Sequence, residues 1–241
     1  MNAGRTARER VRAELIKEIT EIARRQLATE GASGLSLRAV AREMGMVSSA
    51  IYRYFPSRDD LLTTLIIDGY NAVGAAVEQA EAACPRDDYT GRWLAACRAV
   101  RDWALANPHE YALVYGSPVP GYEAPEQTIG PAARAAVVFG RIIGEAFRAG
   151  ACPDTDHRYA DGGPSAPGPF APDAARLREA IMDGVPDHIA AAALIAWSGM
   201  FGLVSFELFG QFENVVTDRA AFFDYAAACL GRLTGLPAPA A

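Results

Sequence analysis

Apolar residues recur at three- and four-residue steps in one segment of the chain after another, which is the spacing of a single helix face. The first such segment starts near residue 7 and ends at Gly31, a residue type that terminates helices. We therefore predict an all-α protein. Its helices are expected at residues 7–30, 36–44, 47–54, 57–83, 88–106, 109–115, 131–150, 187–211 and 218–233.

The segment from Ser36 to Leu62 has the pattern of two short helices joined by a glycine turn. Ser36 is a suitable N-cap, because its hydroxyl can accept from free backbone N–H groups of the first turn. Gly45 stands where the reversing chain needs positive φ. Pro56 closes the second helix, and Ser57 with Asp60 forms a capping box for the third. The segment is predicted to be a helix-turn-helix within a three-helix unit.

The predicted second helix carries side chains suited to DNA. Small or hydrogen-bonding residues at its leading end would let its backbone approach the major groove, while hydroxyls and guanidinium groups would reach phosphates or base edges. An ordinary helical hairpin with a solvated polar face is the alternative. The candidate DNA-binding residues are Arg38, Ser48, Ser49, Tyr52, Arg53, Tyr54 and Arg58.

This segment resembles the DNA-binding segment of the TetR family of bacterial repressors, which typically reads Ala-Arg-Glu-Leu-Gly-Val-Ser-x-x-x-Leu-Tyr-x-His-Phe-x-Ser-Lys-x-x-Leu-Leu. Ile51, Tyr54 and Arg58 replace the family's leucine, histidine and lysine. Val47 departs from the family's Ser or Thr, so Ser48 is expected to take over its role. The identical positions are Ala41, Arg42, Glu43, Met44, Gly45, Tyr52, Phe55, Ser57, Leu61 and Leu62.

Charge divides the chain in the same way. The net charge is −6, yet residues 1–60 hold 11 Arg/Lys against 8 Asp/Glu, and the remainder holds 12 against 21. DNA affinity depends on basic charge where the protein touches phosphates, and the acidic remainder would not favour that contact. We predict a DNA-binding domain at residues 1–60 and a helical ligand-binding and dimerisation domain at residues 61–241.

Other features exclude several classes of protein. The first 25 residues are charged rather than apolar, and no uninterrupted apolar run is long enough to span a membrane, so we expect a cytoplasmic protein without a membrane partner. The four cysteines lack metal or redox spacing. Residues 152–157 contain potential metal ligands within a Gly- and Pro-rich stretch, 150–173, that is expected to be a mobile loop, and we predict no metal site there.

The last two predicted helices have apolar positions in excess of one face, which favours a second copy of the chain as partner. Burial within the subunit is the alternative. Residues 196–210 also resemble a TetR C-terminal subclass named for a Trp-His-Gly signature, with Ser198 at the middle position, and the family resemblance likewise implies a homodimer through four helices. The candidate dimerisation residues are Leu194, Phe201, Val204, Leu208, Phe222, Tyr225 and Cys229.

Aromatic and apolar residues of the middle and C-terminal helices could line a pocket for a small hydrophobic effector. Each of them could equally belong to the core. The candidate ligand-binding residues are Trp93, Cys97, Trp103, Tyr111, Tyr115, Phe139, Ile143, Phe147 and Trp197.

Together these features favour a homodimeric repressor that is released from a palindromic, double-stranded operator by a small-molecule effector. An enzyme is not expected, because the chain has no phosphate-binding loop, no convergent catalytic set and only three histidines. We predict no catalytic residue and no cofactor. A protein-binding adaptor or an activator that uses the same helix-turn-helix is the remaining alternative.

Overall fold

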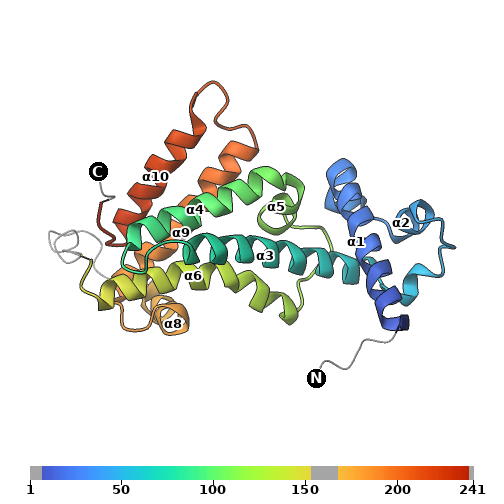
Figure 1. The fold of residues 1–241 in the computed structure, drawn as a ribbon, viewed down its shortest axis with the longest axis horizontal. Helices are drawn as coiled ribbons and strands as arrows, with labels where there is room; N and C mark the ends of the chain where they lie inside the picture. Colours follow the sequence, from blue (N-terminus) through green and yellow to red (C-terminus); the bar gives the residue numbers. More distant parts are fainter. Residues whose placement is uncertain (1–6, 153–167, 239–241) are drawn as a thin grey trace. The chain divides into compact units, whose positions relative to one another are not determined.

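A computed structural model of the chain describes residues 7–152 and 168–238, and within these ranges every regular element is a helix (Figure 1). The predicted all-α fold is thus confirmed. The α-helices are α1 (Ala7–Gly34), α2 (Leu37–Glu43), α3 (Arg58–Ala82), α4 (Tyr89–Ala106), α5 (Pro108–Tyr115), α6 (Ile129–Arg148), α8 (Ala171–Ile181), α9 (Asp187–Leu208) and α10 (Arg219–Leu233). Short 3-10 turns lie at Ile51–Arg53 (η1), Glu126–Thr128 (η2) and Gly168–Phe170 (η3).

Backbone contacts divide the chain into two units. The first contains the residues up to Tyr70 together with Asn107–Pro131, and the second contains Asn71–Ala106 and the residues from Ala132 onward. The first unit therefore extends beyond the predicted domain limit at residue 60, because the first half of α3 and the whole of α5 pack with it. Helix α3 supplies residues to both units.

The first unit has a core of apolar side chains from α1, α2, η1 and α3. Ile19, Val40, Ile51 and Leu61 are fully buried in it. The helix ends follow the local signals of the sequence. Gly31 interrupts α1 with a φ of 68°, and Gly45 turns the chain after α2 with a φ of 67°.

The predicted helix caps in this unit are also confirmed. The Ser36 hydroxyl accepts from the Ala39 N–H at 3.4 Å. At the start of α3, the Ser57 N–H donates to Asp60 Oδ2 at 2.9 Å and the Asp60 N–H donates to Ser57 Oγ at 3.1 Å. These reciprocal bonds satisfy donors that a helix start leaves without partners.

Helix α5 packs on α1 within the first unit. Arg24 of α1 pairs with Asp68 at 2.7 Å and with Glu110 of α5 at 3.1 Å. Nearby, the Tyr70 hydroxyl donates to the Val114 carbonyl at 3.1 Å. These contacts explain why a helix distant in sequence groups with the helix-turn-helix.

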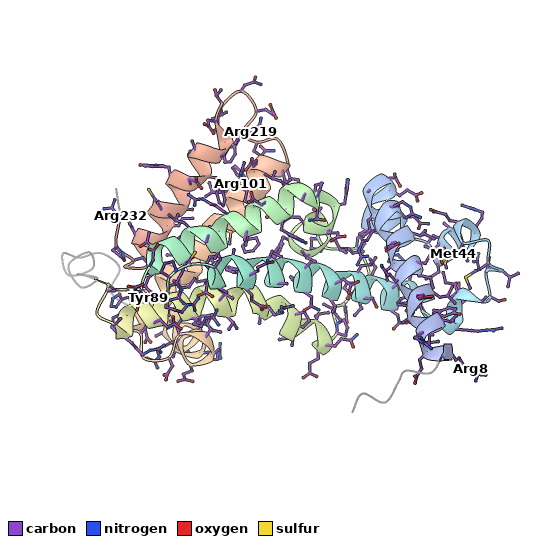
Figure 2. All side chains as sticks on the ribbon, in the orientation of Figure 1. Arg8, Met44, Tyr89, Arg101, Arg219 and Arg232 are labelled. Carbon is purple, nitrogen blue, oxygen red and sulfur yellow. The ribbon has the colours of Figure 1, made fainter. Side chains whose placement is uncertain are left out.

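In the second unit, α4 packs against α9 and α10, and α8 packs against α9. The buried Trp93 indole donates to the Ala227 carbonyl at 2.8 Å, and Gly231 leaves room for the ring, because a Cβ there would meet it at 2.9 Å. Arg101 of α4 (Figure 2) binds the Glu207 carboxylate of α9 through two hydrogen bonds of 2.7 and 2.6 Å.

A buried ionic cluster joins α3, α4 and α6 in the same unit. The Glu81 carboxylate accepts from Arg92 at 2.7 Å and from Arg141 at 2.8 Å, while Arg86 adds a third guanidinium at 2.7 Å. Arg92, which is wholly buried, also pairs with Glu145 at 2.6 Å.

The sequence did not predict α8. Its first three residues fall inside the stretch 150–173 that was expected to be irregular, and Pro172 stands in its first turn, where a proline is tolerated. The rest of that stretch lies mostly outside the described residues, as do residues 153–157 of the segment considered as metal ligands. Among the described residues no group of three or more His, Cys, Asp or Glu is arranged to hold a metal ion.

Helix α9 is the one described helix long and apolar enough to cross a membrane by length and composition, with a mean hydropathy of 1.9. In the second unit it packs against α4, α8 and α10. Ile189, Ala196, Met200 and Val204 are fully buried there. Its apolar character is accounted for in part by these helix contacts.

Candidate nucleic-acid interface

Residues 47–55, which we call the reading segment, follow the glycine turn after α2. Two of its side chains anchor it to the core of the first unit: Ile51 is fully buried and Phe55 nearly so. The predicted α-helix over 47–54 is wrong in its type. The chain forms a turn at residues 48–50 followed by the 3-10 helix η1.

The hydrogen bonds of the reading segment explain this difference. The N–H groups of Ala50, Arg53 and Tyr54 donate to carbonyls three residues earlier, at 2.8, 3.2 and 2.9 Å. No side chain caps the start of η1, so the expected capping by Ser48 does not occur. Two serines at the start, with low helix propensity, and a proline directly after Phe55 leave little length for regular α-helix.

Four of the predicted DNA-binding side chains are exposed on the reading segment, where they can meet a partner. They are Ser48, Ser49, Tyr52 and Arg53, and Tyr52 keeps 44% of its surface exposed although it neighbours the buried Ile51. Arg38 is exposed on α2. These five residues carry hydroxyl and guanidinium donors, which suit phosphate oxygens and base edges.

Tyr54 is half-buried and packs against the core of the first unit. The guanidinium carbon of Arg12 lies 5.3 Å from the centroid of its ring, and Arg12 Nη1 donates to the Arg53 carbonyl at 3.2 Å. Tyr54 therefore contributes to the packing of the reading segment as well as to the surface of that segment.

Arg58 makes two hydrogen bonds within the first unit that the sequence did not predict. Its Nη2 donates to the Ala32 carbonyl at 2.7 Å and its Nε donates to the Leu35 carbonyl at 3.2 Å. These carbonyls belong to the end of α1 and the link to α2, where the helix leaves acceptors without intrahelical donors. We therefore assign Arg58 to holding this turn and remove it from the proposed interface.

Arg42 was not among the predicted DNA-binding residues, although the structure exposes it one turn after Arg38 on α2. The i, i+4 spacing of the two arginines was the signal that could have found it. Val47, at the family's Ser or Thr position, is 73% exposed. Its isopropyl group offers an apolar contact rather than a hydrogen bond, and thymine methyl groups accept such contacts.

The structure brings three of the predicted ligand-binding residues together in the second unit. The rings of Trp93 and Phe139 have centroids 5.0 Å apart, and those of Phe139 and Trp197 are 5.6 Å apart. Phe201 continues this aromatic row, 4.6 Å from Trp197. Trp93 and Phe139 are buried, whereas Trp197 is half-buried.

The other predicted ligand-binding residues are divided between the two units. Tyr111 and Tyr115 belong to the first unit, and the centroids of their rings lie 5.2 Å apart. Burial raises the pKa of Tyr115, with Tyr70 and Tyr111 adding to the effect, so the phenol is neutral at ordinary pH.

The remaining predicted ligand-binding residues lie on α4 and α6. Cys97 and Ile143 are buried there, and Trp103 and Phe147 are half-buried. Burial also raises the pKa of the Cys97 thiol, which favours a role in packing.

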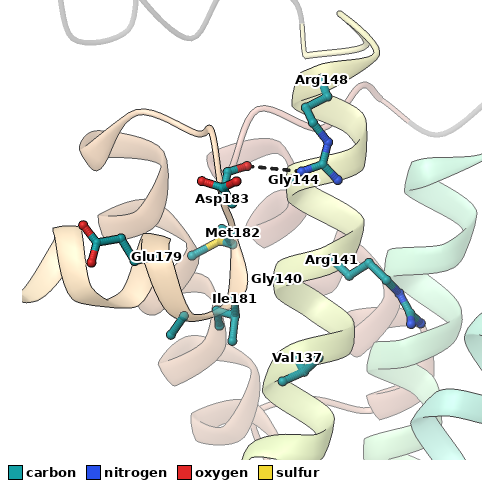
Figure 3. A pocket seen from close by; sticks show the side chains of 10 residues that line it. Val137, Gly140, Arg141, Gly144, Arg148, Glu179, Ile181, Met182 and Asp183 are labelled. Carbon is teal, nitrogen blue, oxygen red and sulfur yellow. Dashed lines mark hydrogen bonds between the residues drawn. The ribbon is translucent and has the colours of Figure 1, made fainter.

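Two hollows described on the surface are lined by other residues. One, of about 260 Å³, lies between α6 and the end of α8, where Arg148 donates to the Asp183 carbonyl at 3.2 Å (Figure 3). Figure 3 shows Arg141 extending away from Asp183. The other, of about 500 Å³, lies between α1 and α2. Neither of these two hollows is lined by any of the nine predicted ligand-binding residues.

The predicted dimerisation residues have unequal exposure. Tyr225 is 71% exposed on α10, and Leu194 and Cys229 are also exposed. Val204 is fully buried within the second unit, which contradicts its assignment to an interface. It faces inward because α9 buries one side against its neighbouring helices. Phe201, Leu208 and Phe222 are half-buried.

Three further apolar side chains, outside the predicted dimerisation residues, are exposed on or directly after α9. Ile195 and Phe206 keep 58% and 53% of their surface exposed, and Phe209 keeps 51%. We call these three residues together with Leu194 and Tyr225 the α9/α10 patch. Large exposed apolar side chains in this number are typical of a surface that contacts another protein subunit.

Family comparisons agree with this architecture. Residues 19–65 match the profile described as bacterial regulatory proteins, tetR family, and residues 93–230 match the profile described as the tetracyclin repressor-like C-terminal domain. The HTH-type transcriptional regulators Mb1846 of Mycobacterium bovis and Rv1816 of Mycobacterium tuberculosis are 40% identical to this chain over 222 residues. The aligned region covers 91% of this chain and 90% of theirs.

Two solved structures share the fold of this chain. A crystal structure of a regulatory protein, SCO4313, is 35% identical, has a TM-score of 0.71, and covers 93% of this chain and 98% of its own. A protein of unknown function from Rhodococcus sp. RHA1 shares the fold, with a TM-score of 0.65, 23% identity, and coverage of 91% and 93%.

The matched profiles and relatives identify this chain as a transcriptional regulator with a helix-turn-helix DNA-binding domain and a larger helical domain after it. The chain belongs to the TetR family. The Trp-His-Gly subclass stays a prediction.

Proposed function

We propose that this protein is a cytoplasmic, homodimeric repressor that binds a palindromic operator and is released from it by a small hydrophobic effector. The observation that carries the DNA-binding part is the reading segment. Buried Ile51 fixes its backbone, and the adjacent Tyr52 and Arg53 side chains project from it into solvent. A rigid backbone with exposed donors loses little entropy when those donors meet DNA.

The proposed DNA-binding surface consists of Arg38, Arg42, Ser48, Ser49, Tyr52 and Arg53. The arginines would neutralise phosphates, and the tyrosine and serine hydroxyls would add hydrogen bonds to phosphates or bases. A two-fold dimer presents two such surfaces, so its operator would be a palindrome with half-sites about 34–36 Å apart or a multiple of that distance.

The proposed effector site is supported by the aromatic row of Trp93, Phe139, Trp197 and Phe201 in the second unit. Such a row offers apolar area and ring faces to a hydrophobic or aromatic compound. Helix α3, which supplies residues to both units, is the proposed route of the signal. The effector would act only through its different affinities for the DNA-bound and free forms.

DNA binding is tested by selecting duplexes from a random-sequence pool with the wild-type protein and then measuring the affinity of Tyr52→Ala and Tyr52→Phe. We expect Tyr52→Ala to lower the affinity for the selected duplex by about tenfold or more, because it removes both ring and hydroxyl. Tyr52→Phe removes the hydroxyl alone and so measures the contribution of that group. Val137→Ala, at an exposed position on α6 outside the proposed DNA-binding and dimer surfaces, is the control and should bind as tightly as the wild type. Failure of the wild type to enrich any sequence would reject the repressor.

The effector is tested separately by thermal shift with a panel of hydrophobic and aromatic compounds, followed by release of the selected duplex. A compound that raises the melting temperature of the wild type and releases DNA should do neither in Trp197→Leu, which removes one half-buried ring from the row. A panel in which no compound stabilises the protein, or an equal response of the variant, would count against this site.

A further inference from the structure

The first turns of α1 precede the part of the chain that matches the family's DNA-binding domain. The match begins at residue 19, whereas α1 begins at Ala7. Residues 8–14 of this helical extension are all exposed, and the first fully buried apolar residue of α1 is Ile19. Figure 2 shows Arg8 at the beginning of the extension. Since these turns contribute little to the core, their contacts with other parts of the first unit indicate what they do.

One side chain of the extension contacts the reading segment twice. Arg12 Nη1 donates to the Arg53 carbonyl at 3.2 Å, and the guanidinium carbon lies 5.3 Å from the centroid of the Tyr54 ring. Arg53 is the last residue of η1, and the final carbonyls of a helical turn lack donors within the turn. An arginine can satisfy such a carbonyl and stack on an aromatic face at the same time.

Tyr54 provides the second half of this contact. It stands where the family motif has histidine, and its larger ring is packed against the core of the first unit. The ring is therefore a fixed surface on which the guanidinium can rest. The reading segment is held from inside by Ile51 and Phe55 and from outside by Arg12.

We propose that Arg12 is a positioning residue that braces the end of the reading segment, so that Tyr52 and Arg53 meet DNA from a fixed backbone. This inference rests on the proposed DNA-binding function. Arg12 acts through the Arg53 carbonyl and the Tyr54 ring and makes no direct contact with the operator. A phosphate contact by Arg12 is the competing explanation, because the side chain is exposed and cationic.

Arg10 is the matched control. It lies on the same extension, is exposed, and makes no hydrogen bond, ion pair or ring contact with another described residue. Arg12→Gln and Arg10→Gln each remove one positive charge from the same turn of one helix. Only Arg12→Gln also removes a contact with the reading segment.

The first measurement needs no DNA. The N–H groups of Tyr54 and Phe55 both donate to the Ile51 carbonyl, at 2.9 and 3.0 Å, so their hydrogen exchange reports opening of the reading segment. We expect Arg12→Gln to speed their exchange by roughly threefold to tenfold, as loss of a cation–π contact and an exposed hydrogen bond implies. Arg10→Gln should leave the rates unchanged. Equal rates in wild type and Arg12→Gln would overturn the proposal.

The second measurement is the salt dependence of binding to a duplex selected by the wild type. A brace predicts that Arg12→Gln binds about threefold to tenfold more weakly with an unchanged slope of log affinity against log salt. A slope smaller by about one unit would mean that Arg12 contacts a phosphate, and the proposal would be wrong. Arg12→Lys keeps the charge without the planar fork, so full recovery by lysine would also contradict it.

The two measurements separate the two hypotheses. If the wild type selects no duplex, the proposed DNA-binding function fails, while the exchange rates of Tyr54 and Phe55 still decide whether Arg12 braces the segment. If the wild type binds DNA and Arg12→Gln changes neither exchange nor affinity, the brace alone is rejected.

Discussion

The carboxylate of Glu81 is buried among three guanidinium groups, which makes its charge important for the second unit. Burial alone would raise the pKa of Glu81. The hydrogen bond from Arg92 and the positive charges of Arg141, Arg92 and Arg86 outweigh it and hold the pKa below the usual value of 4.5. The carboxylate is therefore ionised in the folded protein, and it balances a guanidinium, that of Arg92, which has no access to water.

Glu81→Gln should destabilise the protein by up to about 3–5 kcal/mol at neutral pH, because the wholly buried Arg92 guanidinium would then keep only the Glu145 carboxylate, which is itself partly exposed. Urea unfolding measures this difference. Glu78→Gln is the control: Glu78 lies one turn earlier on α3 and also pairs with Arg134 at 2.6 Å, but it is 44% exposed, so the expected cost is below about 1 kcal/mol. Equal effects of the two substitutions would show that burial of Glu81 is unimportant.

The difference in stability between the wild type and Glu81→Gln should depend on pH. A carboxylate whose pKa is lower in the folded than in the unfolded state contributes stability above its ordinary pKa and loses it as the pH falls through the folded value. The stability advantage of the wild type over Glu81→Gln should therefore be full above about pH 5 and shrink as the solution is acidified below the ordinary value of 4.5. An advantage that is independent of pH would contradict this prediction.

Two glycines on α6 show how one helix face sets the approach of its neighbour. A Cβ added at Gly140 would lie 2.7 Å from the Ile181 carbonyl oxygen, which is backbone and cannot rotate away. One turn later, a Cβ at Gly144 would meet its nearest neighbour at 3.7 Å, an ordinary contact. The packing of α8 on α6 therefore requires glycine at one position and merely tolerates it at the other (Figure 3).

We expect Gly140→Ala to destabilise the protein by about 1–3 kcal/mol through overpacking against the end of α8. Gly144→Ala should instead stabilise it by up to about 1 kcal/mol, since alanine has the higher helix propensity. Thermal or urea unfolding of the two variants measures both effects. If Gly140→Ala were neutral, the close approach of α6 and α8 would be wrong.

Local signals in the sequence were sufficient for most helix ends. Gly31, Gly45, Ser36 and the pair of Ser57 and Asp60 act through neighbouring backbone groups, so their roles could be predicted. Helix α8 was missed because it is short and follows a Gly- and Pro-rich stretch. The α-helix expected over 47–54 became a turn and η1, because its pattern is too short to distinguish the two.

The candidate site could be predicted only where exposure follows from helix spacing. Ser48, Ser49, Tyr52 and Arg53 are polar neighbours of a buried Ile51, and the pattern shows this. The partners of a long side chain are not in the pattern. Arg58 binds carbonyls more than twenty residues away, and Arg12 reaches across 41 residues to Arg53, so both roles depend on the tertiary fold.

At the scale of the whole molecule, the α9/α10 patch is the proposed dimer interface. A two-fold interface uses the same surface on both subunits, so one substitution acts twice. Ile195 is 58% exposed within the patch, and a glutamate there would place a carboxylate on each side of the interface. Val137 of α6, 42% exposed and outside the patch, is the matched position for the same change.

Ile195→Glu should therefore be a monomer at concentrations where the wild type and Val137→Glu are dimers, as measured by light scattering coupled to gel filtration. The monomer keeps its reading segment and should still contact a half-site, but it loses the gain from two linked contacts, about 10²–10⁴-fold in affinity for a palindrome. Loss of the dimer in Val137→Glu with Ile195→Glu unaffected would place the interface on another face. A monomeric Ile195→Glu that binds the palindrome as tightly as the wild type would show that DNA is read by one subunit alone.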